Sequence, residues 1–197
     1  MPLLMLLMWL QVWLGVDGGG GVVHRIPVGR TNPWAGVFER RSGEKRRVGP
    51  HAYGGFSLRY TYEARRFIES GASFVFYQVG VNSHRESFWM AAVPIRWGTQ
   101  IDTSRWTIWG GLRGALLLSA ESSVDVAQVY RFKDYFSRSQ LQLQVGAERS
   151  FTERWALGMQ LSWDITSAWD RVLFQDSRTL PRHLMLGVYG RYFARRL

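Results

Sequence analysis

Charged residues are the side chains best suited to chemistry in this sequence. They lie in segments that alternate polar with apolar positions. Glu148 and Asp164 could act as a general acid and base if they faced each other on adjacent strands. Four arginines share their parity, however, and buried charges persist only when they are paired. We therefore expect an ion cluster rather than an acid–base pair. Its predicted members are Arg59, Glu63, Arg96, Arg113, Glu148, Asp164 and Arg191.

A nucleophilic site is not indicated by the histidines, which are His24, His51, His84 and His183. Ser83 and His84 form the best nucleophile–base pair, but adjacent Ser and His residues are common and seldom catalytic. The sequence contains no H-x-x-x-H metal spacing, no phosphate-binding loop and no G-x-S-x-G elbow. It also contains no cysteine, which excludes disulfides and thiolate metal sites. We predict a protein that is not an enzyme and that has no cofactor and no metal site.

The elements that would hold the charged residues are long β-strands. Trp155, Leu157, Met159, Leu161, Trp163 and Ile165 share one parity, and polar or small residues occupy the other. Successive side chains of a strand point to opposite faces, so this segment has one apolar and one polar face. About eleven residues is long for a soluble strand but suits a tilted crossing of a bilayer.

The same pattern recurs between residue 53 and the C-terminus and predicts seven strands. Their ranges are 53–65, 72–82, 86–99, 105–120, 137–150, 155–165 and 183–195. The links near 68–71, 83–85, 99–104 and 151–153 are short, whereas 121–135 and 168–181 are long. Short turns and long loops are typical of an antiparallel up-and-down transmembrane β-barrel. About eight strands are expected, and the eighth would be a weak strand around 34–38.

The orientation of the two faces decides the function. The polar parity combines arginine, carboxylate and glutamine with small residues, which suits a narrow lumen filled by its own side chains. The residues expected to face lipid or to form the aromatic girdle are Trp89, Trp97, Trp106, Trp155, Leu157, Leu161, Trp163 and Tyr192. The alternative is a soluble, lipocalin-like barrel that binds a lipid or another apolar ligand, with the apolar parity inside.

The N-terminal part of the chain is less regular. Residues 1–16 are apolar and resemble a signal peptide, although no basic residue precedes Pro2 and no A-x-A site follows. A retained hydrophobic segment is the other interpretation. The glycine run 18–21 is interpreted as a linker. The expected organisation is therefore a signal-like segment and linker over 1–21, an irregular region over 22–52, and the barrel over 53–197.

The formal charge of +10 arises almost wholly from arginine, since Lys45 and Lys133 are the only lysines. The arginines are scattered, whereas nucleic-acid-binding modules usually concentrate charge on one face. We expect basic loops that contact anionic lipid headgroups, and no nucleic-acid partner.

Five segments, in their order along the chain, resemble the PorT-like outer-membrane β-barrel family of Gram-negative bacteria. They are Phe56–Arg65, Ala92–Trp97 with its proline, Trp109–Ala120, Leu141–Glu148 and Leu186–Phe193. The resemblance covers residues 53–197 and implies an eight-stranded outer-membrane barrel without a cofactor. It supplies no substrate. We therefore expect a non-enzymatic barrel that is structural or that contacts a ligand or another envelope protein through loops 121–135 and 168–181. A membrane enzyme with its site on the barrel rim is a less favoured alternative.

Overall fold

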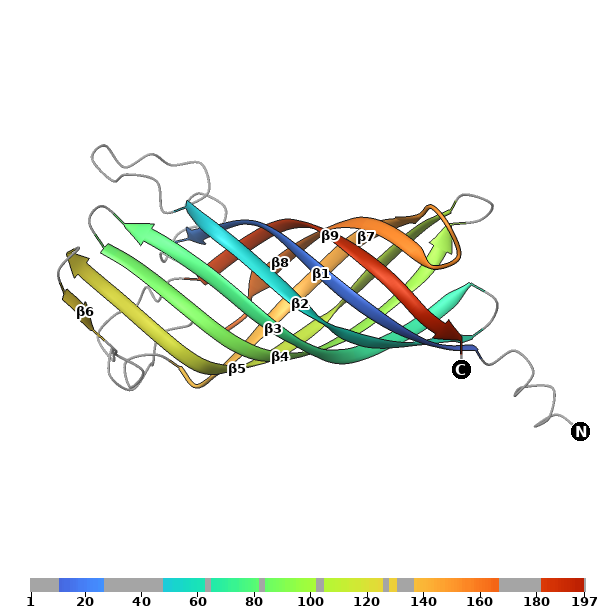
Figure 1. Cartoon of the computed structure of the whole chain (residues 1–197), viewed down its shortest axis with the longest axis horizontal. Coiled ribbons are helices and arrows are strands. Elements are labelled where there is room, and N and C mark those ends of the chain that lie inside the picture. The colour runs from blue at the N-terminus through green and yellow to red at the C-terminus, as the bar shows by residue number, and fades with distance from the viewer. Residues whose placement is uncertain are drawn as a thin grey trace, which may run out of the picture.

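The computed structural model is a closed barrel of antiparallel strands that tilt strongly against the long axis (Figure 1). It describes residues 11–26, 48–62, 65–81, 84–101, 105–125, 128–130, 137–166 and 182–196. Its strands are β1 (Gln11–Ile26), β2 (Val48–Tyr62), β3 (Arg66–Val81), β4 (His84–Ile101), β5 (Trp106–Asp125), β6 (Gln128–Tyr130), β7 (Ser139–Ser150), β8 (Trp155–Asp164) and β9 (Arg182–Arg196). Within these ranges, no helix is long and apolar enough to cross a membrane.

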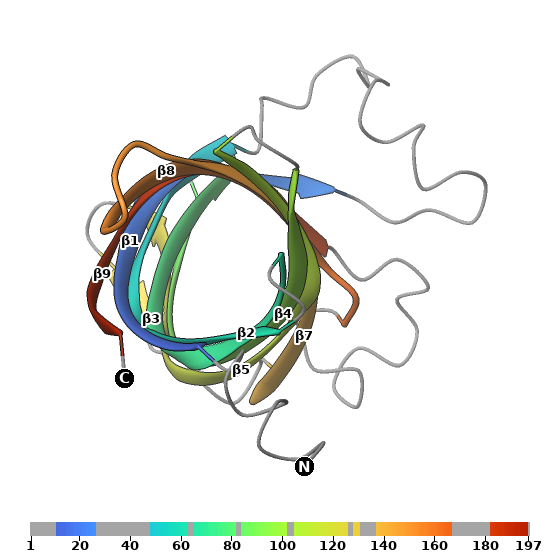
Figure 2. The ribbon, with the colours of Figure 1, turned by 90° about the vertical axis from the view of Figure 1, so that its right-hand side faces the viewer.

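Eight of these strands form the barrel wall, and each pairs with its neighbours in the chain. The wall runs β1-β2-β3-β4-β5-β7-β8-β9, and β9 pairs with β1 to close the ring, as the end-on view shows (Figure 2). The short strand β6 lies outside this ring and extends β5 beyond it as a hairpin. The predicted all-antiparallel barrel of about eight strands is therefore confirmed.

The connections of the barrel are asymmetric. The chain enters β1 at the end where β9 finishes, because Trp13 pairs with Arg196 (Figure 1). The links β2–β3, β4–β5 and β7–β8 also lie at this end and span 63–65, 102–105 and 151–154. We call it the short-turn end. At the opposite, loop end, the β1–β2 and β8–β9 links span 27–47 and 165–181. The β3–β4 link also lies at the loop end but spans only 82–83. The longest links nevertheless lie at the loop end and the other end has only short ones, as is typical of outer-membrane barrels.

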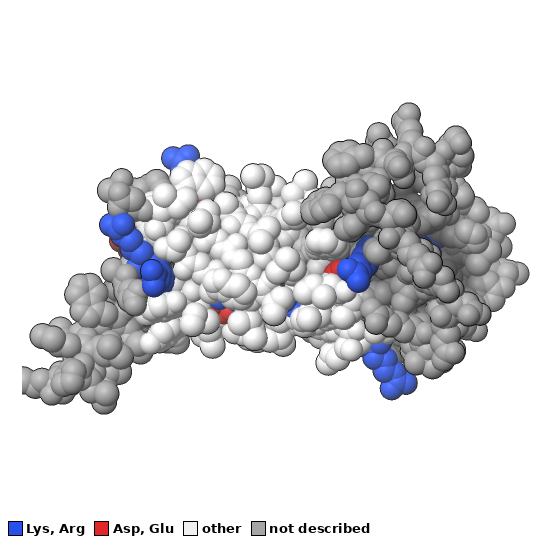
Figure 3. Space-filling view, turned by 180° about the vertical axis from the view of Figure 1, so that it is seen from behind, with Lys and Arg blue, Asp and Glu red and all other residues white. Residues whose placement is uncertain are grey.

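The outer wall is apolar and the lumen is polar. Leu157, on β8, is 57% exposed, whereas its neighbour Ala156 is 1% exposed and faces the lumen. The same alternation holds on β7, where three leucine and valine side chains point outward and three glutamines are buried. Charged side chains on the face of Figure 3 gather near the two ends and leave the middle almost free of them. This is the orientation that hydrocarbon requires.

Tryptophans mark two levels on the outside of the barrel. Trp89 and Trp97 lie eight residues apart on β4, and Trp155 and Trp163 lie eight residues apart on β8. At the strand tilt of a membrane barrel, this spacing corresponds to roughly 20 Å along the barrel axis. The expected lipid-facing residues all lie on the outer parity. Trp163 and Tyr192 are half-buried. The others are more than a third exposed: Trp89, Trp97, Trp106, Trp155, Leu157 and Leu161.

The structure differs from the sequence-based expectation in the N-terminal region. The glycine run 18–21, interpreted as a linker, lies in the middle of β1, and the barrel begins with that strand rather than at residue 53. Glycine predicts a break by propensity, but here it permits close contact between strands. A Cβ atom on Gly19 would collide with the Val188 carbonyl and with Tyr189. The weak strand expected around 34–38 falls outside the described residues.

Two predicted connections also differ. The segment 68–71, expected to be a turn, lies inside β3, and the link between β2 and β3 spans 63–65. The apolar pair Phe67–Ile68 disguised this strand, because Phe67 faces the lumen and breaks the apolar-out alternation. The loop expected at 121–135 begins as an extension of β5 and contains β6.

Pro94 lies within β4, is buried and has the parity of the lumen. The ladder between β3 and β4 is interrupted there, with no paired residues between Ser70–Ile95 and Ser73–Ala92. Proline has no N–H to donate, which explains the gap. The Ser70 hydroxyl donates a hydrogen bond of 3.0 Å to the Pro94 carbonyl and links the two strands across it.

Candidate functional site

A cluster of six charged side chains fills the lumen near the short-turn end. We call it the lumen ion cluster, and it contains three arginines and three carboxylates, so that its formal charges balance. Every member is at least nine-tenths buried. The members come from six strands: Asp17 (β1), Arg59 (β2), Glu69 (β3), Arg96 (β4), Glu148 (β7) and Arg191 (β9).

Glu69 is the centre of this cluster. Its Oε1 accepts hydrogen bonds from Arg96 Nη1 at 3.0 Å and from Arg191 Nη2 at 2.9 Å. Its Oε2 accepts from Arg59 Nε at 2.9 Å. One carboxylate on β3 thus binds arginines from both neighbouring strands, β2 and β4, and from β9, which lies beyond β2 and β1 in the wall. This degree of pairing is what allows four charges to lie in a dry interior.

Glu148 and Asp17 complete the pairing. Glu148 contacts Arg59 Nη2 at 2.7 Å and Arg191 Nη1 at 2.9 Å. Asp17 lies more loosely, at 3.5 Å from Arg96 and 3.7 Å from Arg191. Arg59 and Arg96 therefore each contact two carboxylates, Arg191 contacts all three, and the cluster forms one connected network.

Aromatic rings enclose the arginines. The Arg96 guanidinium lies 4.6 Å from the ring centre of Trp109, and the Arg59 guanidinium lies 4.0 Å from that of Phe67. Trp109 Nε1 donates to the Tyr189 hydroxyl at 2.9 Å, and this hydroxyl donates to Glu148 at 2.9 Å. The rings fill the space between the charges and keep water out, which strengthens each ion pair.

A second polar network lies nearer the loop end. Arg113 Nε donates to Gln142 Oε1, and Gln142 Nε2 donates to Asp164 Oδ1 at 2.6 Å. Asp164 Oδ2 lies 2.8 Å from His183 Nδ1 and also accepts the His183 backbone N–H at 3.1 Å. Gln142 thus connects Arg113 to Asp164 across three neighbouring strands.

The pair of Asp164 and His183 resembles part of a catalytic triad, but its surroundings do not fit catalysis. His183 is fully buried between Tyr77 and Phe88, whose ring centres lie 5.0 and 6.0 Å from its own. Its Nε2 has no hydrogen-bond partner among the described residues, so no nucleophile is presented to it. The described part of the chain also contains no group of three or more His, Cys, Asp or Glu residues that could hold a metal ion.

Apolar and aromatic side chains occupy the rest of the lumen toward the loop end. Tyr77 and Phe88 stack at 4.7 Å, and Met90 and Val75 are buried beside them. Both halves of the lumen are therefore filled by side chains, as expected for eight strands. Among the described residues, the lumen is therefore a filled interior rather than an open channel.

The structure divides the predicted cluster. It brings Arg59, Arg96, Glu148 and Arg191 together, and it places Arg113 and Asp164 in the second network. Glu63 and Ser83 fall outside the described residues. Glu148 and Asp164 do not face each other, because Glu148 pairs with Gly158 and Asp164 with Gln142.

Sequence reasoning missed two members, Asp17 and Glu69. Asp17 was hidden by the glycines that follow it, and Glu69 by the turn assigned at 68–71. A signal was available for Glu69, since it has the same parity as Phe67 and Val75 on a continuous strand.

The barrel is similar in fold to solved bacterial outer-membrane proteins. The crystal structure of Neisserial surface protein A (NspA) matches with a TM-score of 0.54 and 11% sequence identity, over 91% of this chain and 96% of that one. The chain has the fold of a small outer-membrane β-barrel. Ail of Yersinia pestis, in complex with the heparin analogue sucrose octasulfate, gives 0.46 at 14% identity, over 92% and 98% of the two chains. OprG from Pseudomonas aeruginosa gives 0.35 at 12%, over 94% and 96%.

These likenesses concern the fold alone. No protein-family model matches the chain, and no curated protein is similar to it in sequence.

Proposed function

We propose that this chain is a non-enzymatic outer-membrane protein of a Gram-negative bacterium. The observation that carries the proposal is the orientation of the wall, with leucine, valine and tryptophan outside and paired charges inside. A lipocalin-like barrel requires the opposite orientation, with the apolar parity around a ligand cavity. The lumen ion cluster occupies the space that such a ligand would need.

The proposal also includes membership of the PorT-like family. The five segments that resemble the family fall largely on β2, β4, β5, β7 and β9, and one of them contains Pro94 with its interrupted ladder. Their order along the chain, and not any single motif, supports the assignment.

Transport by diffusion is not part of the proposed function. Six charged side chains and the aromatic rings around them fill the lumen near one end, and Tyr77, Phe88 and Met90 fill it near the other. The functional surface is therefore expected at the loop end. We propose that the segments 121–135 and 168–181 contact an envelope protein or a surface ligand there.

The membrane assignment is tested by expression in a Gram-negative host and fractionation of the envelope with detergent. The protein is expected in the outer-membrane fraction, with a gel mobility that changes on heating because the barrel unfolds only when heated. Recovery of the folded protein from the soluble fraction would contradict the proposal.

The role of the loops is tested by replacing residues 168–181 with a short Gly-Ser segment. A matched variant carries the same segment in the short turn 151–154. Photo-crosslinking in intact cells, with the crosslinker at the ends of β8 and β9, is expected to yield a specific adduct that only the first replacement abolishes. An unchanged adduct in a variant with normal heat-dependent mobility would contradict a role for this loop.

A further inference from the structure

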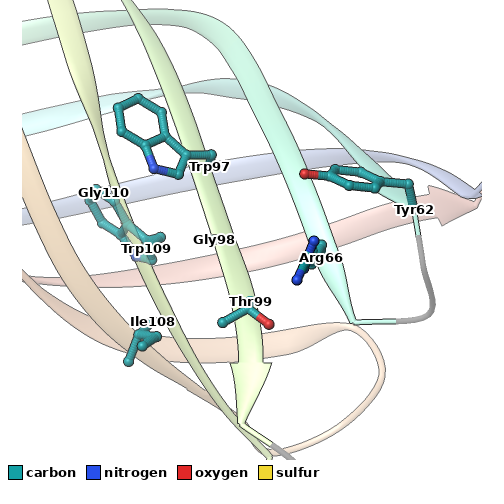
Figure 4. A pocket seen from close by; sticks show the side chains of 8 residues that line it. All are labelled: Tyr62, Arg66, Trp97, Gly98, Thr99, Ile108, Trp109 and Gly110. Carbon is teal, nitrogen blue, oxygen red and sulfur yellow. The ribbon is translucent and has the colours of Figure 1, made fainter.

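A groove lies on the outside of the barrel near the short-turn end. It has a volume of about 360 Å³ and is lined by residues from four neighbouring strands (Figure 4). This volume falls at the lower end of the range for ligand pockets, roughly 300–1,000 Å³. Most of the lining residues lie on the outer parity. They are Tyr62 (β2), Arg66 (β3), Trp97 and Thr99 (β4), and Ile108 and Gly110 (β5).

The groove is polar at one end and apolar at the other. Tyr62, Arg66, Thr99 and Ile108 form one row across the strands, because Tyr62 pairs with Arg66, Arg66 with Thr99, and Thr99 with Ile108. Arg66 is the first residue of β3, so this row lies at the rim. The next row toward the centre of the wall contains Trp97 and Gly110, which also pair.

Gly110 gives the apolar end its depth. It lies on the outer parity between larger residues, and a Cβ atom placed on it would have no neighbour closer than 3.8 Å. Trp97 is 53% exposed and Ile108 is 48% exposed, so that their side chains border a strip of bare backbone. An extended hydrocarbon chain fits such a strip.

The charge around the groove is positive. Exposed arginines at this end of the barrel are Arg65, Arg66, Arg105, Arg149 and Arg154, and Glu153 is an exposed acidic residue among them. Arginine binds phosphate oxygens with paired N–H groups. Basic residues close to a membrane surface also favour anionic lipid over zwitterionic lipid.

We propose that this groove binds one anionic phospholipid of the membrane leaflet at the short-turn end. The phosphate lies on the Arg66 guanidinium, within reach of the Tyr62 and Thr99 hydroxyls. One acyl chain lies over Gly110 between Trp97 and Ile108. The inference rests on the proposed membrane location and adds a specific lipid site to it.

Two substitutions test the two halves of the site, and each has a matched control. Arg66→Gln removes the charge, and Arg154→Gln removes an exposed arginine in the turn 151–154. Gly110→Leu fills the apolar end. Gly114→Leu adds the same side chain to an outward glycine on the same strand, where a Cβ atom has nothing within 4 Å.

The experiment is native mass spectrometry of the folded barrel released from micelles that contain phosphatidylglycerol or phosphatidylcholine. Wild type and both controls are expected to retain one phosphatidylglycerol and to lose phosphatidylcholine. Arg66→Gln is expected to weaken retention about fivefold, the contribution of one arginine near a charged membrane surface. Gly110→Leu is expected to abolish it.

Equal retention of phosphatidylglycerol by wild type and Arg66→Gln would overturn the lipid site, and so would equal retention of the two lipids. A wild-type mass of two barrels, lost in Gly110→Leu, would show a contact between copies and would also overturn it. A barrel that inserts into membranes with heat-dependent mobility but retains no lipid would contradict the lipid site alone. A protein that stays soluble would contradict the proposed function.

Discussion

Arg191 on β9 and Glu69 on β3 meet across the lumen at 2.9 Å, although 122 positions separate them in the sequence. Neither strand pairs with the other, because β1 and β2 lie between them in the wall, so this contact bridges part of the ring through its interior. Backbone hydrogen bonds between neighbouring strands close the wall. The ion cluster adds links between strands that are not neighbours.

Glu69→Gln is therefore expected to destabilise the barrel. The substitution leaves three buried arginines with two carboxylates, and breaking a buried ion pair from one side costs about 3 kcal/mol or more. Urea unfolding in detergent micelles, followed by tryptophan fluorescence, measures this loss. Glu153→Gln, in an exposed turn, is the matched control and should unfold at the wild-type urea concentration. Equal unfolding of the two variants would contradict the structural role of the cluster.

Met159→Arg tests the orientation of the wall. Met159 is 59% exposed, near the middle of β8, and an arginine at the bilayer midplane costs about 2–4 kcal/mol. Phe151→Arg places the same side chain in an exposed short turn, where the cost should be about 0–1 kcal/mol. Unfolding from lipid vesicles compares the two variants. A Met159→Arg barrel as stable as Phe151→Arg would indicate that this face does not meet hydrocarbon.

Arg113 and Asp164 are expected to be energetically coupled, although they are joined only through Gln142. Arg113→Leu leaves Asp164 without the charge that balances it, and Asp164→Asn does the converse. The double variant should then be more stable than the sum of the two single losses implies, by about 0.5–3 kcal/mol. A double-mutant cycle on urea unfolding measures this difference. Strict additivity would show that Gln142 does not transmit the interaction.

Two adjacent glycines provide a test of the first strand. In Gly19→Val the new side chain meets Val188 and Tyr189 in the lumen, and overpacking of this kind costs about 1–3 kcal/mol. Gly18 faces outward, and its nearest neighbour for an added Cβ atom is the Tyr53 carbonyl at 3.5 Å. Gly18→Val should leave the barrel as stable as wild type or slightly more stable, since glycine weakens a strand. Equal tolerance of both substitutions would favour the linker interpretation of residues 18–21.

The sequence predicted the fold class and the two faces because alternation specifies both at once. On β8, five apolar residues at every second position define the strand and its outer face together. Propensity arguments failed where close packing between strands accommodates glycines inside a strand. The glycines around Asp17 suggested a linker, and Gly71 suggested a turn beside Glu69, although both segments cross the barrel.

Which charged residues contact each other could not be predicted from the sequence pattern. Arg113 has the same parity as Arg59, but its partner is set by the register of β5, β7 and β8, which places Gln142 between Arg113 and Asp164. Register depends on the turns, and a shift of a few residues in one turn changes every cross-strand pair. The parity of a residue is therefore readable from sequence, whereas its partner is not.

The seam between β1 and β9 has a consequence for how the molecule is made. β1, the first described strand along the chain, finds one of its two partners in β9, the last described strand, and the pairs extend from Trp13–Arg196 to Ile26–Arg182. Until β9 is available, any partly assembled sheet has two open edges with unpaired N–H and C=O groups. The hydrocarbon core of a membrane offers these groups no hydrogen-bond partners. In the membrane location proposed above, we therefore expect insertion and ring closure to be coupled, because the sheet cannot close before β9 is present.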